Sequence, residues 1–162
     1  MLPLYSNILL PIDFTPNSDH AFKHAVMIAR MNNAKIHLLH VMPEIDSTMI
    51  NYISTFLGES KMAELQQDSA KTVQGEMKKT LDDFAKAELV NFPEDLDRFA
   101  ETEVSVGHPV VKILEAANKL NVDLIVMGTH GKGVLGHTFL GSVAEKVLNK
   151  STRPVFIVPL PK

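Results

Sequence analysis

Short apolar runs alternate along this chain with longer segments whose apolar residues recur at helical spacing. A run of four to eight residues that is apolar throughout suits a strand buried on both faces, and an alternating run suits a half-buried strand. The predicted strands cover residues 8–12, 35–41, 103–106, 122–127 and 153–159. Residues 8–12 form a continuous apolar run, whereas 103–106 alternate.

The segments between these strands carry helix signals. A start signal at residues 15–18 precedes apolar positions at helical spacing up to Met31, and Asn32 and Asn33 then end the helix. Further helices are predicted over residues 61–89, after Pro109, and over 142–150.

Residues 44–60 are ambiguous. Their apolar side chains fall at helical spacing, but the segment is short and Gly58 closes it. They suit a lid, a satellite core, or a partner-binding or dimer patch. The residues concerned are Met49, Ile50, Ile53, Phe56 and Leu57.

The order of elements, strand–helix repeated and closed by a fifth strand, predicts an α/β fold with a five-stranded parallel sheet, doubly wound and Rossmann-like. We expect residues 1–162 to form a single domain. In such sheets ligands bind beyond the carboxyl ends of the strands, where the winding reverses. Asp13 directly follows the first strand, and a glycine-rich segment follows the fourth. We expect these two strands to be neighbours.

The amino-acid composition argues against several kinds of site and several classes of protein. The chain has no cysteine, which excludes disulfides, thiolate metal sites and a cysteine nucleophile. A net charge of −3 argues against sequence-independent nucleic-acid binding. No run of about 18 apolar residues predicts a membrane-spanning helix. The first residues lack a basic region and are interrupted by Asp13, so we expect a cytoplasmic protein rather than a signal peptide.

Five of the eight glycines fall between residues 127 and 142, in a segment without a carboxylate. Gly131 to Gly136 matches the dinucleotide-binding pattern by letter, but it begins four residues after Met127 and lacks the acidic partner about 20 positions on. The Walker pattern also fails, because Lys132 is followed by Gly133 instead of Ser or Thr.

Another spacing suits an anion at a helix start. Gly128 ends the fourth strand, Gly131 lies three residues on, and Gly141 and Ser142 open the last helix. Free N–H groups there attract phosphate, and glycine allows close approach. The alternative is a capping box from Ser142 to Glu145, in which the glycines only shape a loop. We favour the anion site, because a cap needs at most one glycine.

The pattern Gly128-x2-Gly131-x9-Gly141-Ser142 resembles the phosphate motif of the nucleotide-binding branch of the universal stress protein family. The resemblance covers nearly the whole chain, although between about residues 45 and 96 it is one of pattern only. It implies the adenine nucleotide alpha hydrolase-like fold. It also implies bound ATP, or a related adenine nucleotide, with Mg²⁺ or Mn²⁺, and a homodimer joined through residues 155–158.

The resemblance also implies binding residues. Four of these would frame the adenine and ribose: Pro11, Ile12, Asp13 and Val41. Met127 and Gly128 would line the ribose. The residues that would contact the phosphates are His130, Gly131, Gly141, Ser142 and Val143. Asp13 has a second interpretation, as the cap of the first helix.

The favoured function is an ATP-binding, homodimeric regulatory module of a stress response, with a further, unidentified protein partner left open. The alternatives are a slow ATP hydrolase or phosphotransferase, and a nucleotide-free stress-response dimer. Chemistry would need a group that places water and a charge clamp beyond Lys132. No catalytic residue is assigned, because Asp13 is expected on the nucleoside side.

The remaining histidines have plainer interpretations. His20 and His24 lie four apart on a helix, as metal ligands can, but without an intervening glutamate or an evident third ligand we favour solvated side chains. Of His37 and His40, one is expected to be buried with a backbone partner. His137 is expected at the surface.

Overall fold

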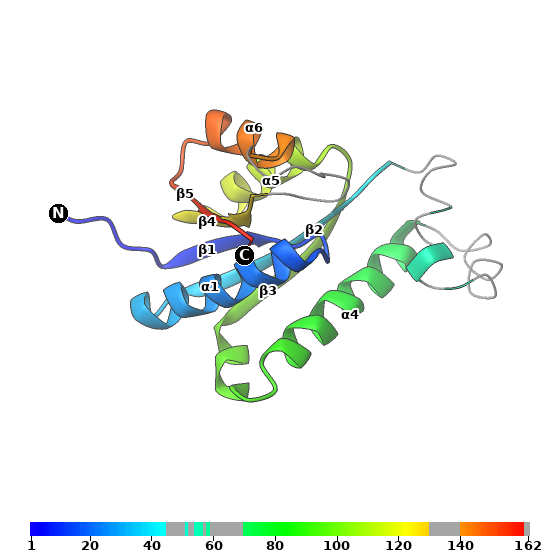
Figure 1. Ribbon diagram of the computed structural model, residues 1–162, viewed down its shortest axis with the longest axis horizontal. Coiled ribbons are helices and arrows are strands. Elements are labelled where there is room, and N and C mark those ends of the chain that lie inside the picture. The colour runs from blue at the N-terminus through cyan, green and yellow to red at the C-terminus, as the bar shows by residue number, and fades with distance from the viewer. Residues whose placement is uncertain (45–50, 52–53, 57, 59–69, 130–139, 161–162) are drawn as a thin grey trace.

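Five parallel strands form one sheet in the order β3-β2-β1-β4-β5 (Figure 1). A computed structural model describes residues 1–44, 51, 54–56, 58, 70–129 and 140–160. The strands are β1 (Asn7–Pro11), β2 (Lys35–Met42), β3 (Phe99–Val106), β4 (Leu124–Gly128) and β5 (Val155–Val158). This arrangement confirms the predicted doubly wound α/β fold.

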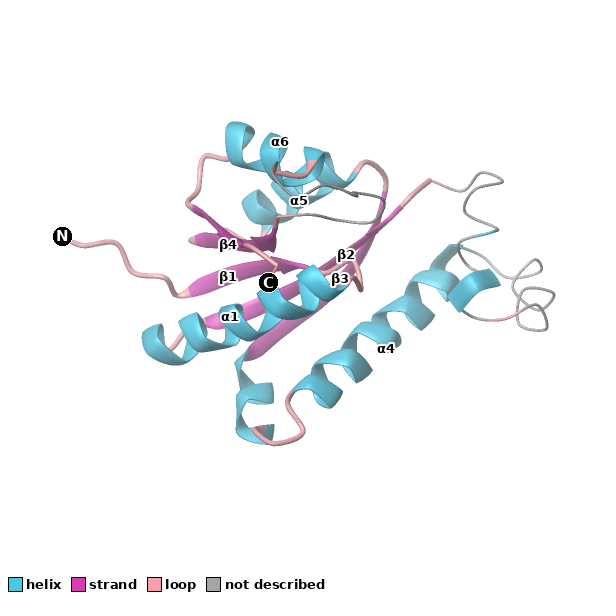
Figure 2. Ribbon diagram, viewed as in Figure 1, coloured by secondary structure: helices cyan, strands magenta, loops and turns pink. Residues whose placement is uncertain are grey.

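Helices cover both faces of the sheet, with α1 and α4 on one side and α5 and α6 on the other (Figure 2). Their bounds, with the 3-10 helix η1, are α1 (Pro16–Asn32), α4 (Ala70–Glu88), η1 (Pro93–Arg98), α5 (Pro109–Lys119) and α6 (Ser142–Lys150). Ile8 and Leu10 of β1 pack on the α1 side, whereas Leu9 packs on the α5 side, and all three are fully buried. This two-sided burial explains why β1 is apolar at successive positions.

Helix α1 begins and ends where the sequence predicts. Thr15 is the N-cap, and its side chain accepts a hydrogen bond from the Ser18 amide (3.4 Å), while Pro16 occupies the first helical position. Asn33 ends the helix in the left-handed conformation, with φ of 50°. The two caps fix the length of the helix that borders the site.

The winding of the sheet reverses beside β1. Strand β2 lies on one side of β1 and β4 on the other, with Ile8 opposite Leu124 and Leu9 opposite Ile125. The expected adjacency of the first and fourth strands is therefore confirmed. The carboxyl ends of β1 and β4 enclose the crevice where ligands of such folds bind.

Strand β3 is longer than the sequence predicts. It begins at Phe99, not at Glu103, and pairs with β2 along most of its length. As an edge strand it exposes Ala100 and Glu101, so its first half lacks the apolar pattern that marks a buried strand.

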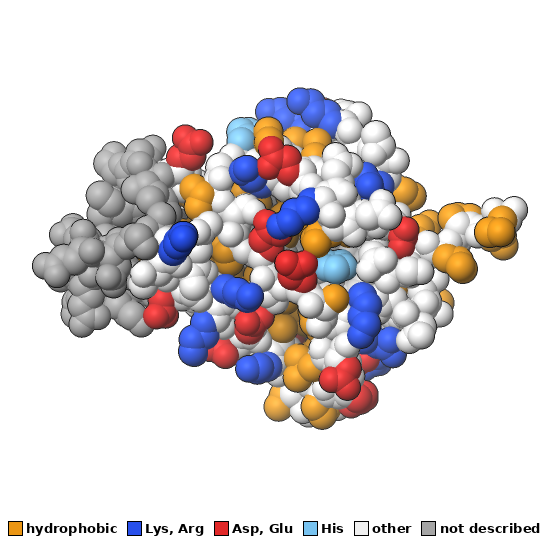
Figure 3. All heavy atoms as spheres, turned by 180° about the vertical axis from the view of Figure 1, so that it is seen from behind, with side chains coloured by type: hydrophobic (Ala, Val, Ile, Leu, Met, Phe, Trp, Pro, Cys, Tyr) orange, Lys and Arg blue, Asp and Glu red, His pale blue; other side chains and the backbone are white. Residues whose placement is uncertain are grey.

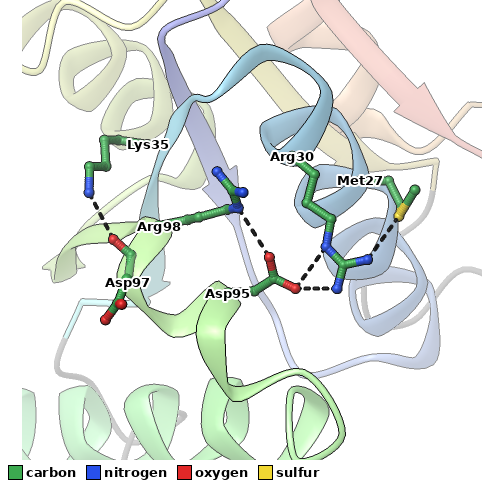
Figure 4. Close-up of polar contacts among 6 residues, drawn as sticks. All are labelled: Met27, Arg30, Lys35, Asp95, Asp97 and Arg98. Carbon is green, nitrogen blue, oxygen red and sulfur yellow. Dashed lines mark hydrogen bonds and ion pairs between the residues drawn. The ribbon is translucent and has the colours of Figure 1, made fainter.

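A buried carboxylate joins η1 to α1 (Figure 4). Asp95 is 2% exposed and accepts hydrogen bonds from the Arg30 guanidinium through Oδ2 and from Arg98 Nε through Oδ1 (3.1 Å). These hydrogen bonds hold the pKa of Asp95 below its usual value, and the bond from Arg30 has the largest effect. Lys35 Nζ donates to the Asp97 carbonyl (2.8 Å) in the same corner.

The surface carries charges of both signs, interspersed over the face seen in Figure 3. The N-terminal segment projects from the sheet (Figure 1), with Leu2 and Leu4 exposed. In the part of the chain that the structure describes, no helix has the length and apolar character needed to cross a bilayer.

Candidate functional site

A cavity of ≈ 350 Å³ opens at the carboxyl ends of β1, β2 and β4. Its volume lies within the range of about 300–1,000 Å³ that small-ligand pockets occupy. Nine of the eleven binding residues predicted from the sequence line it: Pro11, Ile12, Asp13, Val41, Met127, Gly128, Gly141, Ser142 and Val143. The other two, His130 and Gly131, lie outside the described residues, as do Lys132 and His137.

Asp13 supports the start of α1 with one oxygen only. Its Oδ1 accepts hydrogen bonds from the Thr15 amide (3.0 Å) and the Thr15 hydroxyl (2.5 Å). The alternative that Asp13 itself caps the helix is therefore wrong, because Thr15 is the N-cap. Among the described residues, none donates a hydrogen bond to Asp13 Oδ2, and Asp13 lines the cavity.

Phe14 follows in a conformation that a bulky residue rarely adopts, with φ of 61°. Such backbone costs about 1–3 kcal/mol and persists only when packing enforces it. The Phe14 ring packs against His40 (4.9 Å), Phe84 of α4 (6.1 Å) and Phe56 (6.3 Å). Phe56 is the one described member of the apolar set between residues 49 and 57.

The backbone of Ile12 is already paired within the protein. Its amide donates to the Leu39 carbonyl (2.8 Å), and its carbonyl accepts from His40 Nδ1 (2.7 Å). His40 is 2% exposed, which confirms the expectation of a buried histidine with a backbone partner. Because Pro11 has no N–H, these two residues offer a ligand an apolar surface more than hydrogen bonds.

Thr129, at the end of β4, and Gly141, at the start of α6, meet at one junction. The Gly141 amide donates to the Thr129 carbonyl (2.7 Å), and the Thr129 amide donates to the Val158 carbonyl (3.1 Å). Asn17 links the same groups, because its Nδ2 donates to the Val158 carbonyl (3.1 Å) and its Oδ1 accepts from the Thr129 hydroxyl (3.2 Å). Asn17 is buried. From the sequence it was predicted only as part of a helix-start signal, and its role in linking β4 and β5 was not found.

Gly128 lies against the Asn17 side chain. A Cβ at position 128 would lie 2.6–2.9 Å from the three terminal atoms of the Asn17 carboxamide. Real Cβ contacts are essentially never that short. Packing against Asn17 is therefore one reason for a glycine at this position, and the close approach of a ligand stays a prediction.

Helix α6 starts without a side-chain cap among the described residues. Gly141 is the N-cap, with φ of −62° and ψ of 153°, and no side chain bonds to the first turn. The alternative of a capping box from Ser142 to Glu145 is wrong, because that motif needs the serine at the N-cap and Ser142 is already helical. The first turn of α6, including Ser142 and Val143, lines the cavity with its positive end.

A model of the universal stress protein family matches residues 4–159. The chain belongs to the universal stress protein family. The universal stress protein MJ0577 of Methanocaldococcus jannaschii is 32% identical over 98% of this chain and 97% of its own. Universal stress protein A homolog 1 of Coxiella burnetii is 32% identical over 95% and 96%.

Solved structures agree with this membership. The structure of MJ0577 superposes with a TM-score of 0.72 at 31% identity and covers 99% of both chains. The universal stress protein UspA from Lactobacillus plantarum superposes with a TM-score of 0.65 at 24% identity, over 97% of this chain and 99% of its own. The latter shares the fold with this family member.

The charge around the cavity is sparse. Among the described lining residues, Asp13 is the only carboxylate, and neither lysine nor arginine is present. Within the described part of the chain, no three His, Cys, Asp or Glu side chains form a group able to hold a metal ion. The cavity therefore combines an apolar floor, one carboxylate and one helix N-terminus.

Proposed function

We propose that this universal stress protein binds ATP or a related adenine nucleotide in the cavity and acts as a homodimeric, nucleotide-dependent regulatory module of a stress response. The observation that carries the proposal is the start of α6. Its first turn lines a cavity of ≈ 350 Å³, and no described side chain caps it. Uncapped helix N-termini bind phosphate.

The cavity suggests how the nucleotide lies. Its apolar side, with Ile12, Val41 and Met127, suits a purine ring. Asp13 Oδ2 suits a ribose hydroxyl, because an ionised carboxylate only accepts hydrogen bonds. The amides of Ser142 and Val143 suit phosphate oxygens. His130 and Gly131, which the family resemblance also assigns to the phosphates, remain part of the proposal on sequence grounds.

Two other solved structures of the fold contain adenine nucleotides. One universal stress protein was crystallised in complex with cAMP, and one from Archaeoglobus fulgidus in complex with dAMP. At 23% and 16% identity they share only the fold with this chain. The proposal therefore rests on this chain's own cavity and glycine spacing.

A divalent ion would accompany the nucleotide mainly on the nucleotide's own atoms. Mg²⁺ in nucleotide sites takes phosphate oxygens and water, with few protein ligands. The described residues fit this arrangement, since they offer a hydroxyl at Ser142 but no cluster of carboxylates. Such an ion would neutralise phosphate charge.

Binding suits this site better than fast catalysis. Phosphoryl transfer needs a group that positions water and cations that clamp the phosphates. Asp13, the only carboxylate among the described lining residues, already uses Oδ1 to hold Thr15. Slow hydrolysis remains the second candidate. A turnover near 1 per second or above, in the range of ordinary enzymes, would instead make catalysis the favoured function.

The homodimer is proposed to form through β5. This strand lies at the edge of the sheet and pairs within the described chain with β4 alone. Phe156, on β5, is 43% exposed. An exposed apolar edge strand is a template for pairing with another chain. A cytoplasmic location remains an expectation from the sequence.

The proposal is tested by the small molecules that the purified protein carries. We expect adenine nucleotide in the supernatant after denaturation, identified by chromatography and mass spectrometry. Repeated nucleotide-free preparations that also fail to bind added ATP would overturn the proposal and favour the nucleotide-free dimer.

A further inference from the structure

Two histidines on the outer side of α1 face each other at the separation of two ligands that share one metal ion. His20 and His24 lie one helical turn apart on the same face. Their Nε2 atoms are 3.3 Å apart, and their ring centres are 4.8 Å apart with planes at 80°. We propose that this pair chelates a late first-row transition-metal ion of the Zn²⁺ class.

The nitrogen separation fits an ion shared between the two rings. Zn–N bonds are about 2.0–2.1 Å long, so a tetrahedral ion holds two nitrogen ligands about 3.3–3.4 Å apart. A hydrogen bond between the two rings is the alternative at this distance, which lies close to the usual range of about 2.7–3.2 Å for N–H donors, and titration with the ion separates the two. The observed 3.3 Å between the two Nε2 atoms matches the separation of two nitrogen ligands on such an ion.

The helix that carries the pair is held in place. Thr15 caps its start and Asn33 ends it. Ala21 and Ala25, each next to one of the histidines, are fully buried against the sheet. The backbone of the chelate is thus ordered before an ion arrives, which reduces the entropy that binding must overcome. Solvent reaches the pair, because His24 is exposed and His20 half-buried.

Two protein ligands define the chemistry of this site. The described residues contain no third His, Cys, Asp or Glu grouped with the pair, so water or added ligands complete the coordination shell. Imidazole prefers Zn²⁺, Cu²⁺ and Ni²⁺ over Mg²⁺ and Mn²⁺. The site is therefore independent of any ion bound with the nucleotide. It lies beside the β5 edge, where the His24 ring is 6.4 Å from Phe156.

Calorimetric titration of the full chain with Zn²⁺, in excess Mg²⁺ and without nucleotide, tests the proposal. We expect saturable binding of one ion per chain to this site. Loss of groups that merely support a ligand costs about 10–100-fold in metal affinity. His20→Ala and His24→Ala should therefore each weaken binding at least about 10-fold. His108→Ala, at another exposed histidine, serves as the matched control and should bind like the wild type.

Misfolding is a minor concern, because alanine favours helix and both side chains are solvent-accessible. Circular dichroism of each variant verifies this. If the variant with both His20→Ala and His24→Ala binds Zn²⁺ as tightly as the wild type, or if the wild type shows no saturable binding, the proposal is overturned.

Discussion

Replacing Gly128 by alanine tests the packing of the junction beneath the cavity. The new methyl group would lie 2.6, 2.7 and 2.9 Å from Cγ, Oδ1 and Nδ2 of Asn17, so the carboxamide must move. Moving it breaks the bonds to the Val158 carbonyl and the Thr129 hydroxyl. The backbone of Gly128 is not left-handed, so alanine adds no backbone strain.

The magnitude follows from these contacts. Each lost hydrogen bond contributes about 1 kcal/mol net, and overpacking a core costs about 1–3 kcal/mol. We therefore expect Gly128→Ala to lower the free energy of unfolding by about 3–5 kcal/mol. For a chain of this size, that corresponds to a fall of about 6–20 °C in Tm.

A double-mutant cycle isolates the cause. Asn17→Ala alone should cost about 1–3 kcal/mol through its lost hydrogen bonds, and it leaves room for the methyl group. In that background Gly128→Ala should cost about zero. Urea unfolding followed by circular dichroism, at one fixed protein concentration, measures all four free energies of unfolding. Equal costs of Gly128→Ala in both backgrounds would refute the steric explanation.

Two further predictions concern buried ionisable groups. Asp95→Asn should lower the free energy of unfolding by about 2–4 kcal/mol at pH 7, because the variant leaves two partly buried guanidinium groups without their carboxylate. The pKa of Asp95 is lowered in the folded state, so its contribution should be fully present above about pH 4 and be lost progressively as the pH falls further. Urea unfolding should therefore show a smaller stability difference between variant and wild type at pH 3 than at pH 7. Burial lowers the pKa of His37 in the folded state. Below about pH 6.5 the unfolded chain therefore binds a proton at His37 that the folded chain does not bind. The free energy of unfolding consequently falls as the pH drops. His37→Leu should flatten that part of the stability curve, whereas His108→Gln should leave it unchanged; a flat wild-type curve would contradict the assignment.

Much of the fold could be predicted because the local sequence identifies β1 and β4 as strands. Their nearly continuous apolar runs require burial on both faces, and the alternation with helices leaves few topologies. The start of β3 was missed, because an edge strand need not be apolar, and Ala100 and Glu101 are exposed.

The candidate site shows the opposite limit. Its location could be predicted, since carboxyl ends of parallel strands meet at one edge. The sequence did not reveal why each residue stands at its position. Gly128 leaves room for the Asn17 side chain, which lies more than a hundred residues away in sequence, so local spacing does not reveal that contact. Ser142 followed by Glu145 fits the capping-box pattern, yet the helix begins one residue too early for it.

The start of α6 is proposed to hold the phosphates of an adenine nucleotide. The decisive experiment is a titration of nucleotide-free protein with ATP, with Gly141→Val as the variant and Gly75→Ala as the control. A valine side chain at position 141 would add bulk at the N-cap of α6, which lines the cavity, whereas a methyl group at Gly75 would meet no atom within 4 Å. We expect Gly141→Val, shown by circular dichroism to be folded, to lose ATP binding while Gly75→Ala retains it. ATP affinity equal to wild type in Gly141→Val would contradict this proposal.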